Sequence, residues 1–250
     1  MKTSTTRHRL FRSLGAVAFW LAVWWAVSAA VGQPLILPGP PETARALAEL
    51  SAGPAFWTTV GLTLLRIACG FLAGAAAGAL LALGTAFSPL LSAVFSPVMR
   101  LVRSTPVASF IILALLWVAK AAIPALISAM LVAPVIWGGV SAALAGTDRE
   151  LLEMARAYRF GRWKTLRSVY IPSAMPAFSA SCLTAVGLAW KSGVAAEVLC
   201  QLRPSVGAEL YYAKIYLETP RLFAWTAAVV VLSYLLEKFV AAVLRKGAGA

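Results

Sequence analysis

The chain has 250 residues, of which 61% are apolar and only 12% are charged. This charged fraction is about half that of a typical soluble domain, and the mean hydropathy is +0.83. The balance excludes a soluble globular enzyme, a disordered protein and a disulfide-stapled secreted module, and it predicts an all-α membrane protein. We assign the net charge of +13 to membrane topology, because Lys and Arg collect on the cytoplasmic side, and we expect no nucleic-acid partner.

Six apolar stretches follow a basic tail of residues 1–13, and each is long enough to approach the roughly 20 residues that cross a bilayer. The predicted spans are residues 14–31, 56–87, 103–119, 123–145, 172–199 and 222–244. A cleaved signal peptide is the alternative for the first, but its length and its three Trp residues favour a retained helix. A short amphipathic helix over residues 42–50 comes next. We expect one transmembrane domain over residues 14–250, without a second domain.

Small residues and prolines mark the interior of these spans. Gly70, Gly74 and Gly78 recur every four residues in the second span, which creates a face that another helix can approach closely. Packing within the same bundle is favoured over a dedicated dimer contact. Pro106, in the third span, predicts a kink or a broken helix end.

The basic residues also predict the orientation. Fifteen of them fall on the side of the tail and five on the other, while Arg66 and Lys191 lie inside spans. The excess of positive charge places both termini in the cytoplasm.

The polar loop over residues 146–171 is the longest between spans. Thr147 and Glu150 have the spacing of a capping box, which predicts a helix start, and apolar residues then recur at helical spacing as far as Tyr158. Gly161 interrupts this pattern before a second short helix, and Pro172 suits the first turn of the next span. The loop therefore reads as an amphipathic helix–turn–helix along the membrane.

This loop resembles the "EAA" loop of the permease subunits of bacterial ATP-binding-cassette importers. Glu153-Met154-Ala155 and the closing Val169-x-Ile171-Pro172 stand in the register of that motif. Arg159 occupies the position of the motif glycine, and a glycine follows two residues later at Gly161. Either the turn has moved by two residues or Arg159 itself adopts the turn conformation at some cost.

The likeness extends over roughly residues 55–245 and is greatest to the nitrate/sulfonate/taurine-type permeases. It rests on Thr63-Leu64-Leu65-Arg66 with Gly70-Phe71, on Arg103-Ser104-Thr105-Pro106 and on Ala196-Glu197-Val198. The resemblance implies the type I importer permease fold, with six transmembrane helices and a cytoplasmic coupling helix, in a bacterial inner membrane.

It also implies a set of partners. Two copies of the chain would form the pathway, two ATPase subunits would bind below it, and an extracytoplasmic binding protein would deliver the substrate. ATP and Mg would bind the ATPase, so this chain would carry no cofactor; it has no GxxxxGK[ST] loop for phosphates. The residues assigned to ATPase coupling are Glu153, Ala155, Arg156, Arg159, Gly161 and Pro172.

Three ionisable residues inside the spans are candidates for the translocation path or its gate, because such groups are costly in a membrane. Lys191 would attract an anionic solute, or it would pair with a carboxylate on another helix. Glu197 lies six residues further along the same span, on a different helix face, so we expect it to partner Arg66 or to contribute to an outer gate.

Other functions are weaker candidates. The chain has one histidine, His8, three cysteines and nine carboxylates, so neither a metal site nor the acid–base cluster of a membrane enzyme is visible. A stand-alone channel or secondary transporter is the alternative reading. The resemblance implies that the external binding protein, which is another chain, determines substrate selectivity. A small organic anion such as a sulfonate, or nitrate, fits best.

Overall fold

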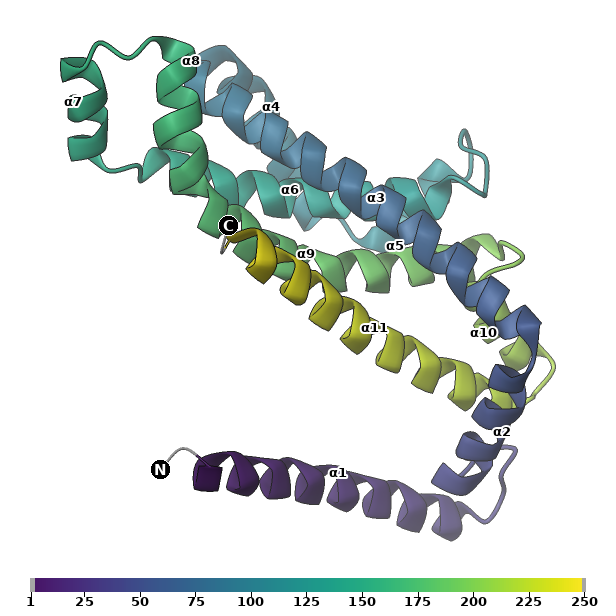
Figure 1. Cartoon of the computed structure of the whole chain (residues 1–250). Helices are drawn as coiled ribbons and strands as arrows, with labels where there is room; N and C mark the ends of the chain where they lie inside the picture. The colour runs from purple at the N-terminus through teal and green to yellow at the C-terminus, as the bar shows by residue number, and fades with distance from the viewer. Residues whose placement is uncertain (1–2, 249–250) are drawn as a thin grey trace. The chain divides into compact units, whose positions relative to one another are not determined.

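The protein is described by a computed structural model that covers residues 3–248, with side chains for residues 15–245. All regular structure in this range is helical. The chain, drawn in Figure 1, divides into two compact units, Met1–Thr58 with Glu209–Val230, and Thr59–Ala208 with Val231–Ala250. Three helices contain a boundary between these units.

The first unit contains α1 (Thr3–Val31), α2 (Pro40–Ala52), the start of α3 (Pro54–Phe87), most of α10 (Val206–Ile215) and the start of α11 (Thr219–Ala248). Its turn after α1 is held by side chains. The Trp24 indole N–H donates to the carbonyl of Pro38 over 3.1 Å, and Trp24 also stacks on Phe223. The expected amphipathic helix over residues 42–50 is present as α2.

The second unit contains the rest of α3 together with α4 (Pro89–Ser104), α5 (Val107–Ala114), α6 (Ile123–Ala145), α7 (Arg149–Ala157), α8 (Arg162–Thr165) and α9 (Ile171–Cys200), and it ends with the last part of α11. Helices α5, α6 and α9 enclose its apolar core, in which Ile111, Ile127 and Ala196 are buried. The observed α6 has the bounds predicted for the fourth span.

The glycine face of α3 packs against α6. A Cβ on Gly74 would lie 2.6 Å from the carbonyl oxygen of Ala129, and one on Gly78 would lie 2.5 Å from that of Ala133. Only a residue without a side chain allows this backbone approach. The expected packing inside the bundle is confirmed.

The helix break expected at Pro106 is present, but the helices on either side of it do not have the bounds predicted for the third span, residues 103–119. Helix α4 ends at Ser104, α5 begins at Val107, and the two are bent by 104°. Pro106 has no N–H to continue the helix and disfavours helical geometry at the preceding residue, so Thr105 is extended, with φ −83° and ψ 135°.

The expected count of six spans is not confirmed. Among the described residues, four helices are long and apolar enough to cross a membrane, and the bent α4–α5 pair brings the number to five. The described apolar part of α1, Gly15–Val31, is shorter. The basic tail of residues 1–13 lies outside the described side chains.

Pro172 lies in the first turn of α9, as expected. Because it lacks an N–H, the helix ahead of it widens into a π-helical turn, Leu166–Tyr170, in which the N–H of Ile171 bonds to the carbonyl of Leu166. As a result α8 continues into α9 without a break, and one helix of 39 residues, Arg162–Cys200, joins the loop to the membrane.

Candidate functional site

Helix α7 begins where the sequence predicts, but the cap differs. The side chain of Asp148 accepts a hydrogen bond of 2.9 Å from the N–H of Glu150, which satisfies one free donor of the first turn. The hydroxyl of Thr147 instead donates to the carbonyl of Ala143 in the preceding helix. The capping box with Thr147 as the cap was therefore wrong by one residue.

The end of α7 resolves the ambiguity at the motif glycine. Arg159 has φ +53°, in the left-handed region, whereas Gly161 has φ −64° and simply precedes α8. The N–H of Phe160 bonds to the carbonyl of Ala155 and the N–H of Arg159 to that of Arg156. These two bonds form a Schellman motif, with an arginine in the position that glycine usually fills.

The apolar residues of α7 occupy two faces, where the sequence suggested one. Ala155 is buried, with 2% of its surface exposed, and Leu152 is half-buried on the same side. Leu151, Met154 and Tyr158 are exposed, at 41%, 43% and 73%, and their spacing of three and four puts them on one outward face. We call these three residues the outward stripe.

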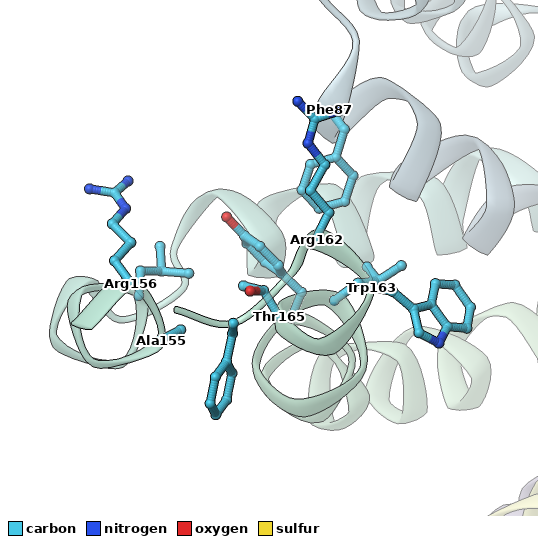
Figure 2. Close-up of a pocket in the computed structure, with 10 residues that line it drawn as sticks. Phe87, Ala155, Arg156, Arg162, Trp163 and Thr165 are labelled. Atoms are coloured by element: carbon cyan, nitrogen blue, oxygen red, sulfur yellow. The ribbon is translucent and has the colours of Figure 1, made fainter. Parts of the chain in front are cut away.

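Ala155 lies on the inward side of α7. Its small side chain faces the space between α7 and α8 (Figure 2). Glu153, Arg156 and Arg159 are exposed, as is Gly161. Of the six residues that the sequence assigns to coupling, Glu153, Ala155 and Arg156 lie on α7, Arg159 and Gly161 follow it, and Pro172 lies at the start of α9.

A pocket of about 700 Å³ lies between α7 and the helix that follows it (Figure 2). Ala155 and Arg156 line one side, and Trp163 and Tyr170 line the other. Phe87, at the end of α3, also lines the pocket and was not anticipated.

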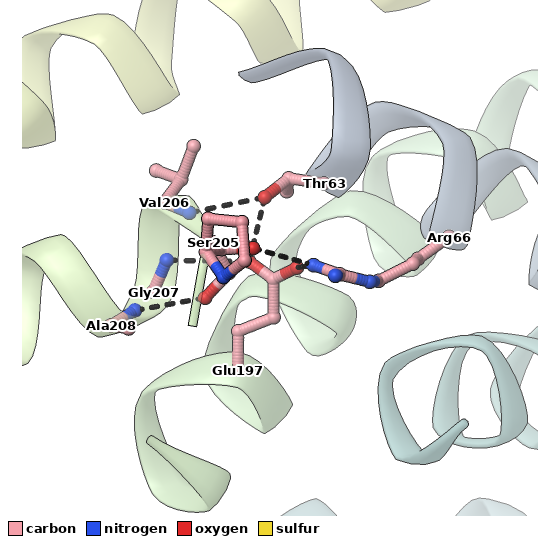
Figure 3. Close-up of polar contacts among 8 residues, drawn as sticks. Thr63, Arg66, Glu197, Ser205, Val206, Gly207 and Ala208 are labelled. Carbon is pink, nitrogen blue, oxygen red and sulfur yellow. Dashed lines mark hydrogen bonds and ion pairs between the residues drawn. The ribbon is translucent and has the colours of Figure 1, made fainter. Parts of the chain in front are cut away.

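The second site is a polar cluster formed by residues of α3, the end of α9 and the start of α10 (Figure 3). The carboxylate of Glu197 is fully buried, and Arg66 forms an ion pair with it at 3.5 Å. Arg66 also donates to the carbonyl of Pro204 over 2.9 Å. The expected partnership of Arg66 and Glu197 is confirmed, and it joins α3, α9 and the residues before α10.

Three further donors complete this cluster. Thr63 donates to Glu197 over 3.0 Å, the N–H of Gly207 donates to the same carboxylate oxygen over 3.2 Å, and the N–H of Val206 donates to Thr63 (Figure 3). A Cβ on Gly207 would lie 2.5 Å from Glu197 Cβ, so glycine permits the approach. Sequence reasoning missed Gly207, although Thr63 stands one helical turn before Arg66 in the quoted motif.

Lys191 lies apart from this cluster. Its side chain is exposed, and it forms no ion pair with any side chain that the structure describes. Glu197 pairs with Arg66 instead. The separation of six residues along α9 puts Lys191 and Glu197 on different faces of that helix.

The described residues contain no group of three His, Cys, Asp or Glu side chains that could hold a metal ion. His8 lies outside the described side chains, and Cys69, Cys182 and Cys200 are free thiols.

Comparison with known proteins identifies what this architecture is similar to. Residues 70–246 match the family model "Binding-protein-dependent transport system inner membrane component". The chain is 25% identical to the taurine transport system permease protein TauC of Escherichia coli (strain K12), over 94% of this chain and 87% of that protein. It is 29% identical to the nitrate import permease protein NrtB of Synechococcus elongatus (strain ATCC 33912 / PCC 7942 / FACHB-805), over 72% and 68%.

A solved structure of an amino acid ABC transporter with histidines has the same fold. The superposition gives a TM-score of 0.60 at 19% identity and covers 81% of this chain and 96% of that one.

Proposed function

Because the chain belongs to the family of binding-protein-dependent transport system inner membrane components, we propose that it forms the substrate pathway of an ATP-driven importer and couples that pathway to a separate ATPase. Two copies enclose the pathway, two ATPase subunits bind on the cytoplasmic side, and a binding protein delivers the solute from outside. Both termini face the cytoplasm, in accord with the distribution of Lys and Arg.

Helix α7 is the element that contacts the ATPase. Its outward stripe exposes Leu151 and Met154 on this helix of nine residues and the aromatic Tyr158 at its C-cap. An amphipathic helix with such a face is the usual ligand of an apolar groove on a partner protein. Glu153 and Arg156 stand beside the stripe and are exposed, which supplies charges for orientation.

The inward face of α7 carries movement to the membrane. Ala155 packs toward α8, and α8 continues through the π-helical turn into α9. A push on α7 therefore acts directly on the helix that carries Lys191 and Glu197. This continuity is the single observation that best supports coupling by α7.

The substrate is a small organic anion such as a sulfonate, or nitrate. The names of the taurine and nitrate permeases that the chain resembles support this class, and so does the exposed ammonium of Lys191 within a span.

Transport in proteoliposomes tests the proposal. The chain is reconstituted with the ATPase and binding protein encoded beside it, and uptake of labelled 2-aminoethanesulfonate, alkanesulfonates and nitrate is measured with ATP or a non-hydrolysable analogue. We expect uptake to require both ATP hydrolysis and the binding protein. Equal flux through the chain alone, without ATP, would instead identify a channel or secondary transporter.

A further inference from the structure

Glu237 is a carboxylate on α11 that the polar cluster does not use. Its Oε1 lies against the backbone of α9, only 2.8 Å from the position that a Cβ on Gly187 would occupy. The Glu237 side chain is exposed, and it forms no ion pair with any side chain in the described part of the chain. The C-terminal part of α11 runs beside α9 (Figure 1), and it brings the Glu237 carboxylate against the surface of α9.

Lys191 lies on the same face of α9 as this carboxylate. It follows Gly187 by four residues, so the two positions are neighbours, one turn apart. Side chains of a helix lean toward its N-terminus, and the Lys191 side chain consequently leans toward Gly187 and Glu237. The ammonium and the carboxylate thus stand on one side of α9 without pairing with each other in this structure.

The charges of Lys191 and Glu237 differ in burial from the cluster around Glu197. Glu197 is fully buried and accepts three hydrogen bonds, as a structural carboxylate should, whereas Lys191 and Glu237 are both exposed. Ionisable groups at membrane depth face a bundle interior or a water-filled cavity. The neighbouring Thr184 and Ala195 on this face are small and exposed, which leaves room between the charges.

We propose that Lys191 and Glu237 are the two poles of one solute position on the water-filled side of α9, and that the solute is a small zwitterion. The ammonium of Lys191 binds its anionic group, and the carboxylate of Glu237 binds its ammonium group. A simple anion would meet the repulsion of Glu237 without compensation. This inference rests on the proposed role of the chain as a pathway subunit. It narrows the proposed substrates to sulfonates that also carry an ammonium group, and it excludes nitrate.

Charged thiol reagents test the position directly in the complex with the ATPase. The exposed Cys69 is first replaced by Ser, while the buried Cys182 and Cys200 remain. Lys191→Cys is then labelled with a negative reagent, 2-sulfonatoethyl methanethiosulfonate, and a positive one, 2-(trimethylammonio)ethyl methanethiosulfonate. We expect the positive reagent to react faster, and Glu237→Gln to lower this preference about tenfold, as removal of one nearby charge should.

The converse pair and a matched control complete the experiment. Glu237→Cys should prefer the negative reagent, and Lys191→Met should remove that preference. Leu235→Cys is on the same helix and exposed without a charge of its own, and it should stay unreactive because it faces lipid. The proposal would be overturned if positions 191 and 237 were labelled no faster than position 235, which is the result expected if these residues pair between two copies of the chain. It would also be overturned if the reagent preference at either position did not depend on the partner charge.

Protection from labelling then tests the solute class. At equal concentration, 2-aminoethanesulfonate should slow the reaction at both positions more than ethanesulfonate or ethylammonium, each of which offers only one of the two charges. Equal protection by ethanesulfonate, or no protection, would reject the zwitterion. If ATP-driven uptake is intact while labelling fails, only this inference is wrong; if uptake itself is absent, the proposed function is wrong.

Discussion

Arg159 shows how a departure from a motif can be accommodated by the backbone. The arginine takes the left-handed conformation that ends α7, and the nearby Gly161 has an ordinary φ. An L-residue in this region costs roughly 1–2 kcal/mol relative to its right-handed conformation. The Schellman hydrogen bonds from Arg159 and Phe160 hold the turn in spite of that cost.

Replacing Arg159 by Gly should therefore stabilise the protein by about 1 kcal/mol, since glycine adopts the left-handed region freely. The measurement is thermal unfolding of the purified chain in detergent. Gly161→Ala is the matched variant, because nothing lies within 4 Å of a Cβ at that position, and it should leave the unfolding temperature unchanged. A loss of stability with Arg159→Gly would show that this turn is wrongly described.

Glu197 is a carboxylate whose partners come from distant parts of the chain. Removing it by Glu197→Ala leaves Thr63 and the N–H of Gly207 without this acceptor and Arg66 without its ion-pair partner. Breaking a buried pair in this way costs about 3–5 kcal/mol, and we expect a loss of that size in unfolding measurements.

The control for Glu197 is the exposed ion pair of Glu218 and Arg221, whose side chains are 42% and 51% exposed. Exposed pairs contribute about 0–1 kcal/mol, so Glu218→Ala should change stability little. Similar losses for Glu197→Ala and Glu218→Ala would contradict the assignment of Glu197 to a structural cluster.

At the scale of elements, the packing of α3 on α6 allows a comparison within one helix. Gly74→Ala introduces a Cβ 2.6 Å from a backbone carbonyl oxygen, whereas nothing lies within 4 Å of a Cβ at Gly61. Gly74→Ala should destabilise the protein by about 1–3 kcal/mol through overpacking. Gly61→Ala should stabilise it by about 0.5–1 kcal/mol, because alanine is the better helix former.

Unfolding midpoints of these two variants in the same detergent check the prediction. Equal tolerance of Ala at Gly61 and Gly74 would mean that the glycine face contacts lipid and not α6.

Elements were predictable from the sequence where hydrophobic runs and caps are local signals. The apolar run of α6 and the proline at the start of α9 sufficed to place both helices. The break between α4 and α5 was predicted only in part. Pro106 predicts an interruption of the helix, but the 104° angle between α4 and α5 depends on packing against α6 and α9. Helix α10 was missed because residues 206–215 lack a clear apolar periodicity.

Side-chain partners were less predictable than helices. Arg66 and Glu197 stood out because charges are rare in spans. Nothing in the sequence distinguishes Gly207 from the other glycines of the chain. The two faces of α7 also required the structure, because Leu151 and Leu152 are adjacent and equally apolar while only Leu152 turns inward. Helical periodicity shows which residues share a face of a helix, but it does not show which face packs against the rest of the chain.

For the whole molecule, the topology makes a testable distinction. With both termini inside, the α4–α5 pair must cross the membrane for α6 to start outside. Lys120→Cys and Lys214→Cys should then react in intact cells with an impermeant thiol reagent, and Lys164→Cys should not. Each is tested in a chain that lacks Cys69, the exposed native thiol. Protection of position 120 together with labelling of position 164 would show that the α4–α5 pair re-enters the same side.

The most direct test of the central claim is co-purification of the ATPase encoded beside this chain. Tagged wild type is compared with Met154→Lys and Glu153→Lys on the exposed surface of α7, and with Leu116→Lys as a control that is 68% exposed and distant from α7 in sequence. We predict that wild type and the control retain the ATPase, and that both α7 variants lose it while still purifying as folded chains. Retention of the ATPase by both α7 variants, or its absence from wild type, would contradict coupling through α7.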